Sequence, residues 1–132
     1  MIFMLSLFFM VLTFQQNTFA TEPHFSFEED FSLPIVYLNL VVDVGSVHDP
    51  AEKLGLANVA SSMLLRGTQK HSKKRFDELL ENIGGKVDVR TDLESTVFSM
   101  AVLSENLNSY LELIVEALTL PKFDSEELAK VK

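Results

Sequence analysis

The sequence contains no cysteine. This absence excludes disulfide bonds, thiolate zinc ligands, a thiol nucleophile and a lipid-modified cysteine at an export cleavage site. Basic residues are also in the minority, with 11 lysines and arginines against 19 aspartates and glutamates, so the formal net charge is −8. This balance argues against nucleic acid and anionic membrane surfaces as partners. The 132 residues show no internal repeat or low-complexity linker and are enough for one modest domain with a hydrophobic core.

The first twenty residues have the features of an export signal. Residues 2–14 are almost wholly apolar, a run too short to span a bilayer comfortably, and Thr18 and Ala20 occupy the small-residue positions that a signal peptidase needs. No lysine or arginine precedes the run. We expect residues 1–20 to be cleaved, so that the mature chain works in the periplasm or outside the cell without a membrane anchor. An uncleaved anchor and a wrongly assigned start remain the alternatives.

The remaining residues alternate between patterns typical of strands and of helices. Residues 21–34 are polar and acidic with scattered phenylalanines, and we expect them to form an extended lead-in. The β-branched run at residues 35–44 predicts a largely buried strand. Apolar alternation predicts a second strand at residues 86–91. Residues 96–103 are apolar on both sides, which predicts a third, central strand.

Four helices are expected between and after these strands. Apolar residues recur at helical spacing from Leu56 to Leu64, and Ser72 is a suitable cap for a second helix. A third helix is expected from Ser104, and Asp124 with Glu127 resembles a capping box opening a fourth. The chain stops inside that helix, so we expect a truncated gene product. The order of elements predicts an α+β fold, a largely antiparallel sheet with helices packed on one face.

Three segments in register resemble one peptidase family. The sequence of residues 55–68, GLANVASSMLLRGT, is similar to the signature helix G-L-A-H-x-x-E-H-M-L-x-x-G-T of pitrilysin/insulinase zinc peptidases. Gly84-Gly85, Thr91, Glu94, Thr96 and Phe98 then resemble the family's strand pair, G-G-x-x-N-A-x-T-x-x-[DE]-x-T-x-[YF]. The opening strand, which ends at residues 45–46, also fits. The resemblance covers residues 35–132 and implies a partial N-terminal domain of this family.

The departures from the signature fall on its chemistry. The family motif H-x-x-E-H supplies two zinc-binding histidines on one helix face and a glutamate that acts as general base. The matching positions here are Asn58, Ser61 and Ser62, and the family's third ligand lies further downstream than residue 132. We therefore predict no catalytic residue and no metal ligand in this chain, with zinc only on a partner or in another domain. The polar face of the helix is expected to border a cleft or an interface.

Other candidate sites are weaker. The resemblance implies that a substrate peptide adds as an extra strand beside Asp88, Val89, Arg90 and Thr91, although the family usually has Asn and Ala at the first two positions. Ordinary strand pairing is the alternative for this segment. The three histidines, at positions 24, 48 and 71, lack the spacing of helical zinc ligands and are expected to be solvated. Ser61 and Ser62 lack a nucleophile-elbow motif and are expected to be small polar filler.

Together these features favour a non-catalytic subunit or pseudo-enzyme of this family. Family members often work as two related halves of which only one carries zinc, so the resemblance implies a zinc-bearing homologous partner and unfolded peptides as ligands. One alternative is a zinc metalloendopeptidase whose catalytic motif lies in another domain of a longer chain. Another is a scaffold protein without a proteolytic role.

Overall fold

The computed structural model describes residues 23–30 and 32–131, so the expected signal at residues 1–20 lies outside the described residues. The chain divides into two units, residues 1–30 and 31–132. In the first unit, residues 23–30 form no regular element and expose the side chains of Phe25 and Phe27. In the part of the chain that the structure describes, no helix is both long enough and apolar enough to cross a membrane.

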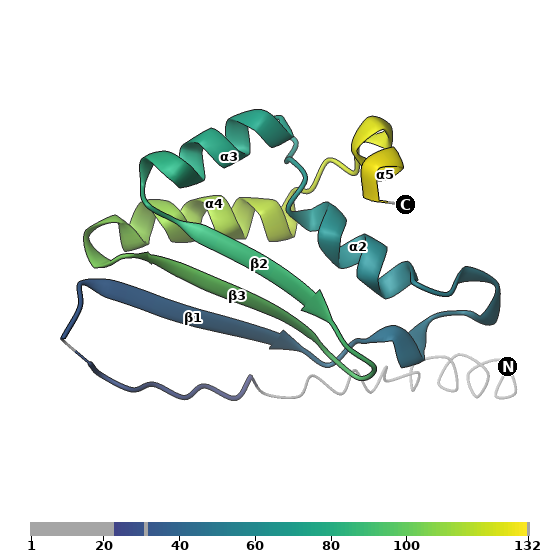
Figure 1. Cartoon of the computed structure of the whole chain (residues 1–132), viewed down its shortest axis with the longest axis horizontal. Helices are drawn as coiled ribbons and strands as arrows, with labels where there is room; N and C mark the ends of the chain where they lie inside the picture. The colour runs from purple at the N-terminus through teal and green to yellow at the C-terminus, as the bar shows by residue number, and fades with distance from the viewer. Residues whose placement is uncertain (1–22, 31, 132) are drawn as a thin grey trace, which may run out of the picture. The chain divides into compact units, whose positions relative to one another are not determined.

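The second unit is built on a three-stranded antiparallel sheet. Its strands are β1 (Ile35–Val42), β2 (Lys86–Thr91) and β3 (Thr96–Leu103), arranged in the order β1-β3-β2 (Figure 1). β3 pairs with β1 from Ile35↔Leu103 to Val42↔Thr96 and with β2 from Lys86↔Ala101 to Thr91↔Thr96. The bounds of β2 and β3 and the central place of β3 are as the sequence predicts.

The expectation that the first strand is largely buried is wrong. β1 lies at the edge of the sheet, and Tyr37 and Val41 are 70% and 57% exposed. Both point to the face opposite the helices, where their partners on β3 are Ala101 and Val97. A continuous apolar run predicts a strand but does not say whether a second layer covers both of its faces.

Helices cover one face of the sheet. They are α2 (Leu56–Leu64), α3 (Lys73–Asn82) and α4 (Leu107–Thr119), and a further helix, α5 (Ser125–Val131), packs on α2. Three short 3₁₀ turns, η1 (Ser46–His48), η2 (Ala51–Lys53) and η3 (Ser104–Asn106), join the elements. The buried core lies between α3, α4 and the sheet and comprises Phe76, Leu80, Phe98, Met100, Val102, Tyr110, Ile114 and Ala117. The α+β prediction with helices on one face is confirmed.

The helix ends agree with the sequence except at two places. The hydroxyl of Ser72 accepts a hydrogen bond from the Arg75 N–H, so the predicted cap of α3 is confirmed. The helix expected from Ser104 begins as the turn η3, and α4 follows it. Asp124 caps α5 by accepting from the Glu126 N–H. The glutamate half of the expected capping box is not formed, because the Glu127 carboxylate binds Arg66 and Lys130 instead.

A polar cluster fastens the loop between α2 and α3 to α4. The Glu116 carboxylate accepts hydrogen bonds from the Thr68 hydroxyl and from His71 Nδ1, and Lys70 Nζ lies 3.5 Å away. The Thr68 oxygen in turn accepts from the backbone N–H groups of Lys70 and His71. Burial alone raises the pKa of the Glu116 carboxyl, but the hydrogen bonds from Thr68 and His71 and the nearby charges outweigh it and hold that pKa below its ordinary value near 4.5.

This cluster predicts a specific acid sensitivity. Because the Glu116 pKa is lower in the folded state than in the unfolded state, the ionised carboxylate stabilises the fold at any pH above its ordinary pKa. This stabilisation is lost as the pH falls through the lowered pKa of the folded state. Glu116→Gln is expected to reduce stability near neutral pH and to flatten the dependence of unfolding free energy on pH below about 4.5. Denaturant unfolding at several pH values measures this, with Glu112→Gln on the same helix as control. Equal slopes in both variants would contradict it.

Candidate functional site

The helix α2 carries the three degenerate motif positions and is held by the loop before it. Asp49 accepts hydrogen bonds from the Gly55 N–H at 2.7 Å and the Ala57 N–H at 2.8 Å, so this carboxylate satisfies two of the free donors at the start of α2. Gly55 adopts a left-handed backbone with φ of +89° at the cap position. The C-terminal end of α2 is tied to α5 by the Arg66–Glu127 ion pair at 3.1 Å. The helix is therefore fixed at both ends.

Ser61, at the position of the family's general base, is buried in a chain of hydroxyl groups. Its Oγ donates to the carbonyl of Asn58 at 3.0 Å and lies 2.8 Å from Thr91 Oγ1 at the end of β2. Thr91 Oγ1 is 3.2 Å from Thr96 Oγ1, and the Thr96 hydroxyl donates to the Val44 carbonyl at 2.8 Å. Three segments that are far apart in the sequence, at residues 44, 58–61 and 91–96, thus meet through three hydroxyls.

This arrangement takes Ser61 out of the polar face of α2 that was expected to border a cleft or an interface. Asn58 is exposed and Ser62 half-buried, but Ser61 packs against the sheet instead of bordering a cleft. The three positions supply one amide and two hydroxyls, a donor set that does not fit zinc, which takes imidazole, thiolate and carboxylate ligands. Both partners of Ser61 Oγ, a carbonyl and a hydroxyl, lack the basicity to remove its proton. We therefore derive neither a metal-dependent nor a serine-dependent reaction at α2.

The hydroxyl chain predicts a structural role for Ser61. Ser61→Ala removes two hydrogen bonds of a buried hydroxyl and is expected to lower the free energy of unfolding by about 1 kcal/mol. Ser62→Ala on the neighbouring half-buried position is the control and is expected to change it by less than about 0.5 kcal/mol. Thermal or urea unfolding measures both. A larger effect at Ser62 than at Ser61 would show that the chain of hydroxyls does not hold α2 to the sheet.

The strand β2 places the predicted peptide-binding segment at an edge with which no other strand of the described residues pairs. The Asp92 N–H donates to the Ser95 carbonyl at 2.8 Å, so Asp92 and Ser95, which face each other at the end of the hairpin, form a pair of the hydrogen-bonded type. Pairs alternate along an antiparallel ladder, so Thr91↔Thr96 and Val89↔Phe98 are pairs without backbone hydrogen bonds. The N–H and C=O groups of Val89 and Thr91 therefore point away from β3, toward the edge. Asp88 and Arg90 pair with β3 through their backbones and expose their side chains on the open face of the sheet.

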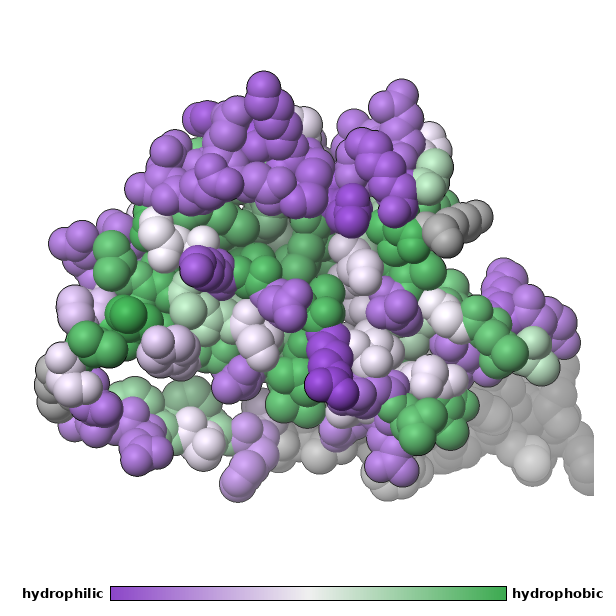
Figure 2. Space-filling view, viewed as in Figure 1, coloured by the Kyte–Doolittle hydropathy of each residue, from purple (hydrophilic) through white to green (hydrophobic). Residues whose placement is uncertain are grey.

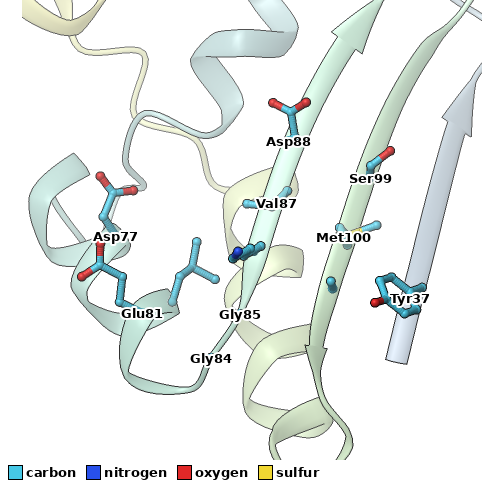
Figure 3. A pocket seen from close by; sticks show the side chains of 12 residues that line it. Tyr37, Asp77, Glu81, Gly84, Gly85, Val87, Asp88, Ser99 and Met100 are labelled. Carbon is cyan, nitrogen blue, oxygen red and sulfur yellow. The ribbon is translucent and has the colours of Figure 1, made fainter. Parts of the chain in front are cut away.

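A groove lies beside the first half of β2 (Figure 3). Its lining includes Leu80 and Glu81 of α3, the glycine turn at Gly84-Gly85, and Val87 and Asp88 of β2. Asp77 and Glu81 come from the helix, and Asp88 from the strand (Figure 3). By the same alternation, the backbone groups of Val87 point to the free edge. The groove thus lies next to backbone donors and acceptors with which no strand of the described residues pairs.

The hydrogen bonds of His48 and His71 go to residues outside α2 and β2. His48 stands in η1, where its Nδ1 accepts from the Gly45 N–H, and His71 binds Glu116 on α4. The expectation of a solvated His71 is wrong, because its side chain is only 29% exposed and is held by that carboxylate. Within residues 23–30 and 32–131, no group of three or more His, Asp or Glu side chains is placed to hold a metal ion.

The sequence is similar to those of known proteins. The family model described as Insulinase (Peptidase family M16) matches residues 25–132. An uncharacterised zinc protease of Rickettsia bellii is 35% identical over 95 residues, which cover 72% of this chain and 23% of that protein. A protein of Helicobacter pylori described as non-peptidase homolog YmxG is 29% identical over 121 residues, 92% of this chain and 28% of that protein. The chain thus spans about a quarter of the length of the curated relatives it matches.

The fold also recurs among solved structures. The crystal structure of a peptidase M16 inactive domain from Pseudomonas fluorescens matches with a TM-score of 0.71 and 24% sequence identity. The match covers 76% of this chain and 24% of that one. This likeness shows that the sheet and helices of this chain have the same fold as the matching part of that larger structure.

Proposed function

We propose, from the premise that this chain belongs to the insulinase family (peptidase family M16), that it acts as a non-catalytic family member. In this proposal it pairs with a zinc-bearing homologous subunit and helps to enclose peptides that the partner cleaves. The observation that carries the proposal is the contrast between α2 and β2. The helix carries Asn58, Ser61 and Ser62 where the family motif has two histidines and a glutamate, while no strand of the described residues pairs with the outer edge of β2.

Peptide binding at this edge requires only backbone chemistry. A peptide laid antiparallel to β2 would exchange hydrogen bonds with the outward N–H and C=O groups of Val87 and Val89. These groups do not depend on zinc or on the side chains of α2. A chain with Asn58, Ser61 and Ser62 at the motif positions can therefore keep this role although it does no chemistry.

The pairing is tested by purifying the tagged full-length protein from its own host and identifying its partners by mass spectrometry, with bound zinc measured alongside. We expect a co-purifying relative that carries H-x-x-E-H and about one zinc ion for each pair of subunits. Stoichiometric zinc together with peptide cleavage by this protein alone would overturn the proposal. Neither zinc nor such a partner would instead favour a scaffold protein.

The peptide edge is tested by a proline substitution. Val89→Pro removes an N–H that points away from β3, and proline is tolerated at such edge positions. The loss of one backbone hydrogen bond, about 1 kcal/mol, is expected to weaken peptide binding by the paired subunits roughly fivefold. Val89→Thr keeps the N–H and is the control. If both variants bind a fluorescent peptide equally well in anisotropy titrations, the peptide does not add to β2.

We also propose that the mature protein works outside the cytoplasm. The support is the apolar run at residues 2–14, followed by Thr18 and Ala20 at the positions a signal peptidase recognises. N-terminal sequencing of the protein from its host is expected to begin at Thr21. A mature chain that still begins at Met1 would overturn this assignment.

A further inference from the structure

Exposed apolar side chains lie in the β2–β3 turn and in the loops leading into α2, and the Ser46 and Val47 N–H groups bond the first of these loops to the turn. Val47, Leu54 and Leu93 are 66%, 80% and 73% exposed, and Val44 is also exposed. We call these four residues the loop-end patch. In the view of Figure 2, hydrophobic surface lies over this end of the molecule, below α2. Several large apolar side chains exposed on neighbouring loops are typical of an interaction site.

The backbone beneath the patch is fixed by hydrogen bonds. The N–H groups of Ser46 and Val47 donate to the carbonyls of Asp92 and Leu93 at 3.0 and 2.9 Å, which joins the two loops side by side. The Thr96 hydroxyl holds the carbonyl of Val44. Leu54 is positioned by the bond from the Gly55 N–H to Asp49. The backbone that carries the patch is therefore held in place before binding, which reduces the conformational entropy lost when a partner binds.

The rim of the patch is acidic. The exposed acids next to it in the sequence are Asp43, Glu52, Asp92 and Glu94, against the two basic residues Lys53 and Arg90. Arg90 is already paired with Asp92 at 3.2 Å. An acidic rim disfavours an anionic membrane surface, and it disfavours a second copy of this chain, whose rim would carry the same charge. It favours a protein surface with an apolar centre and a lysine- or arginine-rich rim.

We infer that the loop-end patch is the surface through which this chain binds its zinc-bearing subunit, and that the partner meets it with an apolar centre and a basic rim. This inference rests on the proposed function, since it assigns a contact surface to the partner proposed there. The patch adjoins the N-terminal end of α2, so a subunit docked on it would lie beside the degenerate motif and the end of β2. Its apolar centre would supply affinity, and its charges would supply orientation and association rate.

The test uses the full-length protein in its own host with a photoreactive benzophenone amino acid at position 93. We expect a cross-link to the H-x-x-E-H-bearing relative, at a segment rich in lysine or arginine, with a yield that falls as salt rises. The same amino acid at Val115, which is exposed on α4, is the control and is expected to give no such adduct. Adducts to phospholipid or to a second copy of this chain would overturn the inference.

A substitution separates this inference from the proposed function. Leu93→Glu changes an exposed side chain and is expected to reduce recovery of the zinc-bearing relative by about tenfold, whereas Val115→Glu leaves recovery unchanged. If Leu93→Glu and Val47→Glu both retain the relative, the patch is not the contact surface, although the pairing itself stands. If the unmodified protein recovers no zinc-bearing relative, the proposed function fails and this inference fails with it.

Discussion

Replacing Asn58 and Ser62 together with histidine is expected to give this chain a zinc-binding site. The two positions lie one turn apart on α2, an exposed and a half-buried residue on a helix fixed at both ends. Histidines at this spacing can both reach one zinc ion at about 2.0–2.1 Å. Binding that is restricted to the folded state is expected to raise the free energy of unfolding by about 2.7 kcal/mol at a free zinc concentration of 100 times Kd.

Thermal unfolding with and without Zn²⁺ measures this gain, and a chelator should reverse it. The single variants Asn58→His and Ser62→His are the controls, because one imidazole supplies too few ligands for a stable site. Zinc-dependent stabilisation of the double variant alone would mean that the helix keeps the geometry of the motif and has lost only its chemistry. Equal responses of all three variants would mean that the two side chains do not converge.

Adding Ser61→Glu to the double histidine variant is not expected to restore peptide cleavage. Ser61→Glu would place a longer, charged side chain where a buried hydroxyl now binds Thr91. The triple variant is therefore expected to be less stable than the double variant. We expect it to show no peptidase activity, because two histidines and a glutamate on α2 supply one zinc ligand fewer than the three protein ligands of catalytic zinc sites. Peptide cleavage by the purified triple variant would contradict this account of α2.

The substitution with the largest expected effect on stability is Gly45→Ala. A Cβ atom at this buried position would lie 2.4 Å from the carbonyl oxygen of Leu93 and 2.5 Å from that of Asp92. Both oxygens accept the hydrogen bonds that join this loop to the β2–β3 hairpin. Relieving the overlap requires the two backbones to separate, so we expect a loss of about 3 kcal/mol in the free energy of unfolding.

Gly55→Ala is the matched control for this prediction. No atom lies within 4 Å of a Cβ at Gly55, so its cost comes only from the left-handed backbone, about 1 kcal/mol. Urea unfolding of both variants separates steric overlap from backbone strain. A smaller loss at Gly45 than at Gly55 would show that the loop and the hairpin can move apart without cost.

Most features of the fold that could be predicted from the sequence depend on residue patterns within a single helix or strand. The alternation of Val87 and Val89 with charged residues and the apolar spacing from Leu56 to Leu64 depend on neighbours within one element, so the bounds of β2 and α2 follow from them. The exposure of β1 does not follow, because it depends on whether another layer covers Tyr37 and Val41. Periodicity within a strand carries no information about that layer.

The residue types at the candidate site follow from the sequence, but their contacts do not. The mismatch of Asn58, Ser61 and Ser62 to a zinc motif can be read from residue types alone. The burial of Ser61 cannot, because its partner Thr91 lies thirty residues away and reaches it only through the packing of α2 on β2. The role of Asp49 was also missed, since it caps α2 across the intervening turn η2. Its position before Pro50 indicated only a loop.

The edge position of β1 has a consequence for how this protein behaves at high concentration. Seven of the eight residues in IVYLNLVV are apolar and none is charged, whereas β2 carries a charge at every second residue from Lys86 to Arg90. Within the described residues, no strand pairs with the outer edge of β1. Charges of the β2 kind act as gatekeepers against fibril growth, and β1 has none. Cross-β aggregation of this protein is therefore expected to start at β1 and to slow when a lysine replaces Val41 on its exposed face.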